Sequence, residues 1–133
     1  MNEFQEIQNI ISSMNINTNI LTWAVLIGIM VDFITGIAKG YKTGQKISSS
    51  KLRDGSFKKA GIILVILLSY ELSLLFNDNH RIIFNGVQLY YFYMETVSIM
   101  ENLIEIGVDV PWVLRKALGD KKSELLNGED NER

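Results

Sequence analysis

Three apolar stretches divide this chain. If they cross a membrane, all but one of its Lys and Arg residues lie on the same side of it. The sequence contains 13 Lys and Arg residues, and none of them precedes Lys39. Only Arg81 lies between the second and third stretches, whereas the others follow the first stretch or the third. Membrane proteins retain Lys and Arg in their cytoplasmic segments. The distribution therefore predicts a multi-pass chain whose N-terminus lies outside and whose C-terminus lies in the cytoplasm.

The three apolar stretches have lengths that suit membrane-spanning helices. The first covers residues 20–38, which reach roughly 28 Å at about 1.5 Å per residue, close to the hydrocarbon thickness of a bilayer. The second, 60–76, is the most apolar, and the third, 82–106, is longer and more mixed. The polar turn 77–81 is short enough to make its flanking helices antiparallel. We therefore predict an all-α membrane protein with three transmembrane helices.

A basic segment, residues 39–59, connects the first and second spans. Its glycines, consecutive serines and charges argue against a span, so we predict a cytoplasmic loop. Basic residues beside a membrane are attracted to anionic headgroups by about 1 kcal/mol each near the surface. Orientation alone would explain the cluster, and lipid contact is a second interpretation. The basic residues of this membrane-surface loop are Lys39, Lys42, Lys46, Lys51, Arg53, Lys58 and Lys59.

The two ends of the chain are predicted to be peripheral parts of a single membrane domain, 1–133. Residues 2–14 place apolar and polar side chains on opposite faces, which is typical of an amphipathic helix at the membrane surface or of a packing helix. Gly107 is predicted to cap the third span, and Pro111 suits the first turn of a short helix that ends at residue 118. Residues 111–133 would then form a cytoplasmic tail.

One face of the first span combines small residues with a single charge. Its members recur every four residues, so they form one stripe along a helix. Small residues let a neighbouring helix approach closely, and a carboxyl among them faces protein or water instead of lipid. The second span carries an acid as well. The predicted helix-packing or oligomer residues are Gly28, Asp32, Gly36, Gly40 and Glu71, with chance placement of the glycines as the alternative.

The third stretch is two-faced, because its polar residues follow helical spacing. This polar face is predicted to be pore-facing and consists of Asn85, Gln88, Glu95, Ser98, Asn102 and Glu105. The helix could span the membrane and line a polar cavity, lie on the membrane surface, or belong to a soluble bundle. The acids could also pair helices within one protomer instead of lining a pore. The short turn before the helix and the basic residues after it favour a span.

Composition argues against several other classes of protein. A net charge of −2 indicates no nucleic-acid partner. The chain has no cysteine, which excludes disulfides and thiolate metal sites. No catalytic triad, phosphate-binding glycine loop or metal-ligand cluster is recognisable. We therefore expect no cofactor.

Three passages resemble the toxin-secretion and phage-lysis holin family of bacteria and their phages. The first, DFITGIAKGYKTGQKISSS, joins an acid and a small-residue helix end to a basic, serine-rich loop. The second, DGSFKKAGIILVILL, leads from a glycine and paired lysines into an apolar run. The third, ETVSIMENLIEIGVDVPWVLRKAL, is the most specific, because it combines an acid-rich helix with a fixed distance from glycine to proline. The residues on matching positions are Asp32, Glu95, Glu101, Asn102, Gly107 and Pro111.

The resemblance implies a small protein of the bacterial inner membrane that is not an enzyme. Holins accumulate in membrane lipid, assemble as homo-oligomers and open lesions that release an endolysin or, in some relatives, a protein toxin. The endolysin is a functional partner that the holin does not need to bind. A small ion channel or accessory membrane subunit is one alternative function. A soluble helical interaction module is another.

Overall fold

The computed structural model describes residues 2–13 and 16–118, and every element within those ranges is a helix. The predicted all-α class is therefore confirmed, whereas residues 119–133 of the predicted tail lie outside the described residues. The helices are α1 (Glu3–Ser13), α2 (Thr18–Lys42), α3 (Ser49–Leu75), α4 (Ile82–Ile106) and α5 (Trp112–Leu118).

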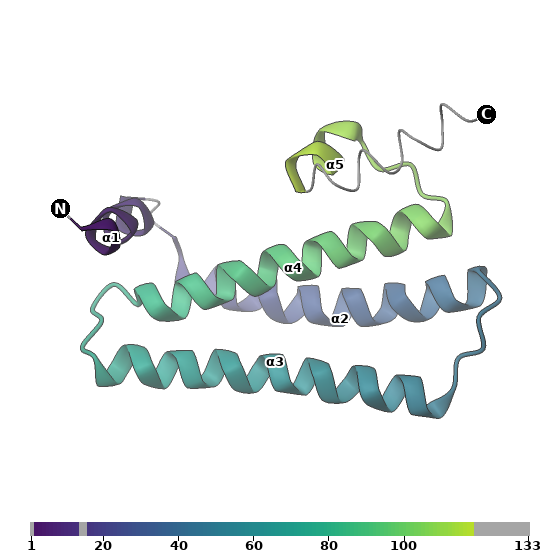
Figure 1. Ribbon diagram of the computed structural model, residues 1–133, viewed down its shortest axis with the longest axis horizontal. Coiled ribbons are helices and arrows are strands. Elements are labelled where there is room, and N and C mark those ends of the chain that lie inside the picture. The colour runs from purple at the N-terminus through teal and green to yellow at the C-terminus, as the bar shows by residue number, and fades with distance from the viewer. Residues whose placement is uncertain (1, 14–15, 119–133) are drawn as a thin grey trace.

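The three long helices lie side by side along their lengths (Figure 1). α2 and α4 run in the same direction. α3, which comes between them in the sequence, runs in the opposite direction. α4 packs most extensively on α2 and also packs along α3, so it holds the bundle together. α1 and α5 also contact α4. α1 lies at the end of the bundle where α4 begins, whereas α5 follows the other end of α4.

The predicted loop 39–59 is wrong in its extent, because helices occupy most of it. α2 continues to Lys42, and α3 begins at Ser49, eleven residues before the predicted start of the second span. Ser48 explains the early start, since its Oγ accepts a hydrogen bond from the backbone N–H of Lys51 at 3.1 Å. Gly44, with φ +71°, supplies the left-handed backbone that turns the chain. The connector is thus a short turn between long helices.

The turn between α3 and α4 is held by two side chains that serve as caps. Asp78 accepts the backbone N–H of Ile83 at Oδ2 (2.9 Å), and Ser73 accepts that of Phe84 at Oγ (3.1 Å). Arg81 takes the N-cap position with φ +50° and gives no side-chain cap of its own. These bonds satisfy helix-end N–H groups that would otherwise lack partners.

The end of α4 follows the prediction. Gly107 is its C-cap, with φ +104° and backbone hydrogen bonds to the carbonyls of Leu103 and Ile104. The carbonyl of Pro111 then accepts hydrogen bonds from the first turn of α5. The chain therefore changes direction between Gly107 and Pro111, as the sequence predicts.

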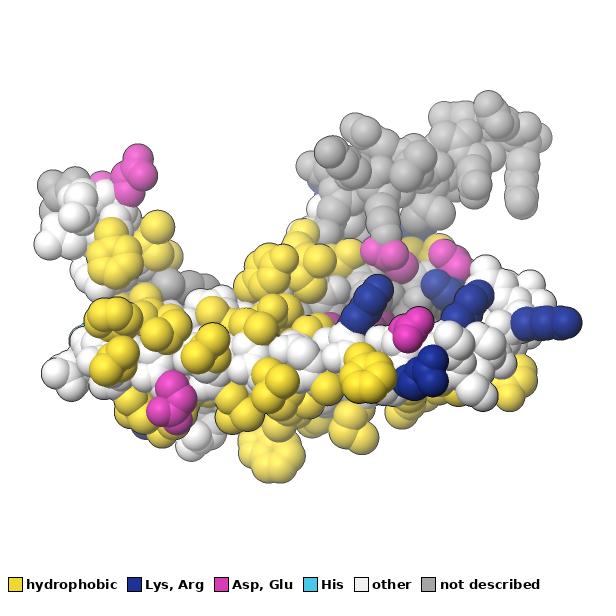
Figure 2. Space-filling model, turned by 60° about the horizontal axis from the view of Figure 1, so that its bottom comes forward, with side chains coloured by type: hydrophobic (Ala, Val, Ile, Leu, Met, Phe, Trp, Pro, Cys, Tyr) yellow, Lys and Arg dark blue, Asp and Glu magenta, His cyan; other side chains and the backbone are white. Residues whose placement is uncertain are grey.

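The bundle buries several polar side chains beside an apolar core and exposes many large apolar ones. The buried polar side chains in the described residues are Asp32, Ser69, Ser73, Asn85, Gln88, Glu95 and Asn102. Large apolar side chains on all three long helices are exposed instead, including Trp23, Ile27, Met30, Ile34, Leu64, Leu67, Leu68, Leu75, Tyr90 and Met94. Figure 2 shows apolar side chains spread over most of one face, with Lys and Arg gathered at one end. So much exposed apolar surface is unusual for a water-soluble protein, so the exterior suits apolar surroundings.

Among the described helices, α2 alone is long and apolar enough to cross a membrane, so the three predicted spans are not confirmed. At about 1.5 Å per residue it spans roughly 38 Å, more than the hydrocarbon core of a bilayer. α3 carries Lys58, Lys59 and Glu71 around its apolar part. α4 carries its own buried polar face.

Candidate functional site: a charged cluster shared by three helices

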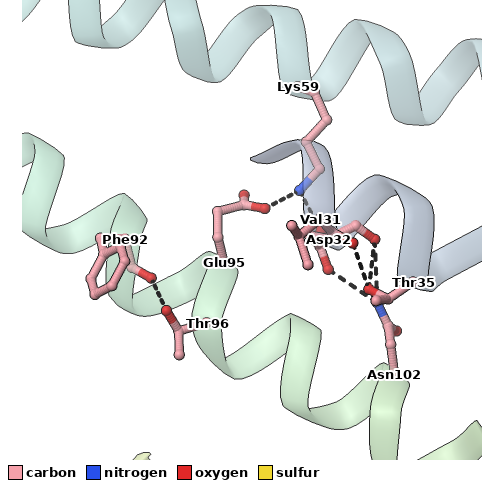
Figure 3. Close-up of polar contacts among 8 residues, drawn as sticks. All are labelled: Val31, Asp32, Thr35, Lys59, Phe92, Glu95, Thr96 and Asn102. Carbon is pink, nitrogen blue, oxygen red and sulfur yellow. Dashed lines mark hydrogen bonds and ion pairs between the residues drawn. The ribbon is translucent and has the colours of Figure 1, made fainter. Parts of the chain in front are cut away.

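Each long helix contributes one charged side chain to a cluster inside the bundle (Figure 3). Lys59 of α3 donates hydrogen bonds from Nζ to Oδ2 of Asp32 on α2 and to Oε2 of Glu95 on α4, both at 2.5 Å. One ammonium group therefore bridges two carboxylates. The three helices are joined at a single point by ion pairs.

Asn102 completes the shell around Asp32. Its Nδ2 donates hydrogen bonds to Oδ1 of Asp32 and to Oγ1 of Thr35, both at 3.1 Å. The Thr35 hydroxyl in turn donates to the backbone carbonyl of Val31 at 2.8 Å. Both carboxylate oxygens of Asp32 thus have a partner, one from α3 and one from α4.

The cluster is shielded from its surroundings. The side chains of Asp32 and Glu95 are 10% and 5% exposed, and that of Lys59 is 21% exposed. Removing one partner from a buried ion pair costs about 3–5 kcal/mol, because the charge left behind is uncompensated. A variant that lacks Lys59 would leave two such charges. The lysine is therefore the residue on which the closed arrangement of this cluster depends most.

The glycine stripe of α2 faces α4 within the protomer over most of its length. A Cβ on Gly28 would lie 3.6 Å from Cβ of Glu95, and one on Gly36 would lie 3.8 Å from Nδ2 of Asn102. Gly40 differs, because its nearest neighbour is Ile47 of the following turn, at 3.1 Å. The small residues let α4 approach closely enough for Asn102 to reach Asp32.

Glu71 does not join the cluster. Its side chain is exposed, whereas Ser69 and Ser73, two residues away on either side, are buried. A helix turns about 100° per residue, so positions two apart point in nearly opposite directions. The prediction that Glu71 packs against another helix is therefore wrong for the single protomer. A role for it between copies of the chain stays a prediction.

The predicted polar face of α4 points into the bundle for most of its length. Asn85, Gln88, Glu95 and Asn102 are buried, and Ser98 is half-buried. Glu105 is exposed and pairs at 3.8 Å with Lys39, which is half-buried. In this arrangement the face contacts neighbouring helices, as in the interpretation that acids pair helices within one protomer.

Two amides on this face have buried atoms without a hydrogen-bond partner. Gln88 is fully buried, and both its Nε2 and its Oε1 are unpaired within the described residues. Oδ1 of Asn85, one helical turn earlier, is unpaired as well. Burying an unsatisfied polar group costs about 1–3 kcal/mol. These atoms therefore lie in the bundle without the hydrogen bonds that would offset the cost of burying them.

Sequence reasoning missed the position of Lys59, which it assigned to the surface loop. The other basic residues of that segment lie on α2 (Lys39, Lys42), in the turn (Lys46) or on α3 (Lys51, Arg53, Lys58). Lys59 shares a stripe with Gly55, Ile62 and Ile66, at spacings of four, three and four residues. The stripe faces the other helices, and its period was the signal that could have placed Lys59 in the interior.

The cluster offers no metal site: no group of three or more His, Cys, Asp or Glu side chains suited to a metal ion occurs in the part of the chain that the structure describes. Its chemistry is that of a charged contact between helices. Such a contact can hold an arrangement closed or, when it breaks, expose charge to water.

Known proteins resemble this chain over most of its length. Residues 9–123 match the bacteriophage holin family. A protein of Clostridium perfringens strain 13, named as uncharacterised, is 36% identical over 80% of this chain and 75% of its own. A second Clostridium perfringens protein, a 14.9 kDa product of the nagH 3′ region, is 37% identical over 71% of this chain and 70% of its own. A probable holin of Bacillus phage phi105 is 31% identical over 71% of this chain and 73% of its own. No solved structure matches.

Fold and site together define an all-helical protein that exposes many apolar side chains and buries a charged cluster beside an apolar core. An intramembrane ionisable group is expensive in lipid and by default indicates function. The chain belongs to the bacteriophage holin family. Membership in this family supports a holin role and implies a location in a membrane.

Proposed function

We propose that this protein is a holin that oligomerises in the bacterial inner membrane and opens lesions for host-cell lysis. The lesions release an endolysin to the cell wall or, as the family resemblance implies, a protein toxin. The protein is not an enzyme in this proposal, and it needs membrane lipid and further copies of itself as partners. Family membership and the phage phi105 relative named probable holin support the proposal.

In the proposed topology α2, α3 and α4 each cross the membrane. The alternating direction of the three helices supports this, as does the apolar exterior that they share. The turn 43–48 lies at the basic end of the bundle, and the turn before α4 lies at the opposite end with α1. Retention of positive charge in the cytoplasm then places the N-terminus outside and the C-terminus inside. α1 exposes Phe4, Ile7 and Ile10 and suits the membrane surface.

The observation that carries the proposal is the polar interior closed by Lys59. A lone acid at the bilayer centre costs about 2.5–3.5 kcal/mol on insertion scales. Pairing with Lys59 lets Asp32 and Glu95 enter the membrane with much of this cost offset. A bundle of this kind is stable as a closed, non-conducting protomer.

Opening would turn the same face toward water. When copies assemble, the polar face of α4 can leave α2 and α3 and line a water-filled centre. Water then hydrates the separated charges and provides partners for the Gln88 amide and for Oδ1 of Asn85, which are unpaired in the closed bundle. The polar groups that hold the protomer closed thereby become the lining of the lesion.

Inducible expression in bacteria tests the function. The chain is expressed alone, with a cytoplasmic endolysin that has no secretion signal, and with a catalytically inactive endolysin. We expect an abrupt fall in turbidity only with the active endolysin. Steady turbidity in that culture, while the chain is present in the membrane fraction, would contradict a holin.

The same cultures separate a holin from a small ion channel. A folded cytoplasmic reporter enzyme is assayed in the medium after the cell-envelope layers outside the inner membrane are permeabilised. Lesions large enough for endolysin also release the reporter, whereas a channel collapses the membrane potential and retains it. Carbonate-resistant membrane fractionation separates both from a soluble interaction module.

A further inference from the structure

A cleft opens between α2 and α3 at the basic end of the bundle. Its volume is about 520 Å³. α2 and α3 make little contact with each other, because each packs mainly on α4. The floor of the cleft is the charged cluster, with Asp32, Lys59 and Asn102 among its lining residues. Its rim is formed by the turn after α2 and the first turns of α3.

Positive charge dominates the lining of this cleft. Lys39, Lys46, Lys51, Lys58 and Lys59 all line it, with Asp32 as the single carboxylate. Lys59 is matched by Asp32 and Glu95, and Lys39 is matched by Glu105. In the part of the chain that the structure describes, no ion pair is formed by the remaining three lysines. The rim of the cleft therefore carries positive charge that an anion can neutralise.

The walls of the cleft combine this charge with apolar surface. Phe33 and Ile37 line one side and Leu52 the other. Gly55 keeps the space open, because its nearest neighbour across the cleft is the ring of Phe33, 3.9 Å from a Cβ built there. Cations above an apolar slot are complementary to an amphiphile with an anionic head.

We propose that this cleft binds the phosphate headgroup of an anionic phospholipid such as phosphatidylglycerol. The proposal rests on the proposed function, because only the three-span topology places the cleft at the cytoplasmic headgroup layer. Basic pockets between membrane helices on the cytoplasmic side are suited to such headgroups. The unpaired rim lysines Lys46, Lys51 and Lys58 contact the phosphate. The lipid wedges α2 and α3 apart next to the cluster that closes the bundle.

Native mass spectrometry of the full chain in detergent tests the site. The protein is equilibrated with equal amounts of phosphatidylglycerol and phosphatidylcholine of the same acyl chains, and the retained lipids are counted. We expect preferential retention of phosphatidylglycerol. The double variant Lys51→Gln, Lys58→Gln is expected to lower this preference roughly 25-fold, because each lysine near a membrane surface contributes a factor of about five. Lys42→Gln with Arg53→Gln removes the same charge from exposed positions outside the cleft and leaves retention close to wild type.

A second variant keeps every charge and fills the space. Gly55→Leu places a side chain against Phe33, so it is expected to lower phosphatidylglycerol retention without altering net charge. Equal retention of the two lipids by the wild type overturns the proposal. Equal losses in the two double variants also overturn it, because they indicate diffuse attraction to the basic end. Displacement of the lipid by excess inorganic phosphate would assign the site to free phosphate and overturn it too.

Lysis with endolysin is measured in parallel on the same variants. If the wild type lyses cells but retains the two lipids equally, the lipid site is contradicted and the proposed function is not. Failure of the wild type to lyse contradicts the proposed function, whatever lipid it retains.

Discussion

Lys59 and Glu95, 36 residues apart in the sequence, meet inside the bundle with 2.5 Å between Nζ and Oε2. The same ammonium group binds Asp32, so α2, α3 and α4 converge on one lysine. A charge that sequence patterning assigns to the membrane surface is thereby the centre of the closed arrangement. The predictions below follow from that contact and from the polar interior around it.

Replacing Lys59 should loosen the bundle. Lys59→Met leaves Asp32 and Glu95 as buried, uncompensated carboxylates, which is expected to destabilise the folded chain by about 3–5 kcal/mol. Thermal unfolding in detergent measures this, with Arg53→Met as the control on an exposed position of the same helix. The triple variant Lys59→Met, Asp32→Asn, Glu95→Gln should recover much of the loss. Equal unfolding temperatures for Lys59→Met and Arg53→Met would show that the cluster contributes nothing.

Neutralising one acid should delay lysis. Asp32→Asn leaves a balanced pair of Lys59 and Glu95, so the closed bundle keeps its link and carries less charge to be hydrated on opening. Glu95→Gln leaves the pair of Lys59 and Asp32 and should act in the same direction. Membrane accumulation is expected to stay normal. The time from induction to the fall in turbidity measures the effect, and wild-type timing in both variants would count against a role for the acids in opening.

Gln88 should be a site where an apolar side chain stabilises the closed state. Its amide is fully buried and unpaired, so Gln88→Met removes a desolvation cost of about 1–3 kcal/mol at similar volume. We expect a higher unfolding temperature together with delayed lysis. Gln45→Met, at an exposed position, should change stability by less than about 0.5 kcal/mol. A Gln88→Met protein that is less stable than wild type would mean that the amide has a partner in the membrane.

The glycine stripe predicts a contrast between two leucine substitutions. A Cβ on Gly28 already lies 3.6 Å from Glu95, so Gly28→Leu has to push α4 away and is expected to cost about 1–3 kcal/mol. A Cβ on Gly61 of α3 meets no atom within 4 Å, so Gly61→Leu should be tolerated better. Unfolding in detergent compares the two variants. Similar losses in both would indicate that α2 and α4 do not pack through this stripe.

The sequence was sufficient for the helices because their signals are local. The apolar runs, the cap at Gly107 and the helical period of the face from Asn85 to Glu105 need only neighbouring residues to be recognised. The sequence was a poorer guide where a helix begins within a charged segment. Ser48 starts α3 within a segment that reads as a loop, so Lys59 enters the interior instead of staying at the surface.

The sequence alone could not predict which side chains pair with the buried acids. Asp32, Lys59 and Glu95 meet only because α3 runs antiparallel to α2 and α4, and this register depends on packing among all three helices. Glu71 shows the converse, since its position two residues from Ser69 and from Ser73 directs it away from the interior. The three-span topology and the lesion stay predictions from charge patterning and family membership.

Thiol labelling at Gln88 tests most directly whether the face that is closed in the protomer lines the lesion. The chain has no cysteine, so Gln88→Cys introduces a single thiol, and Ile63→Cys places the matched thiol on the exposed apolar side of α3. Cells are treated with a membrane-impermeant thiol reagent before and after the onset of lysis. We predict that Gln88→Cys is protected before onset and labelled afterwards, while Ile63→Cys is protected throughout. Continued protection of Gln88→Cys in cells that have released their endolysin would contradict the account.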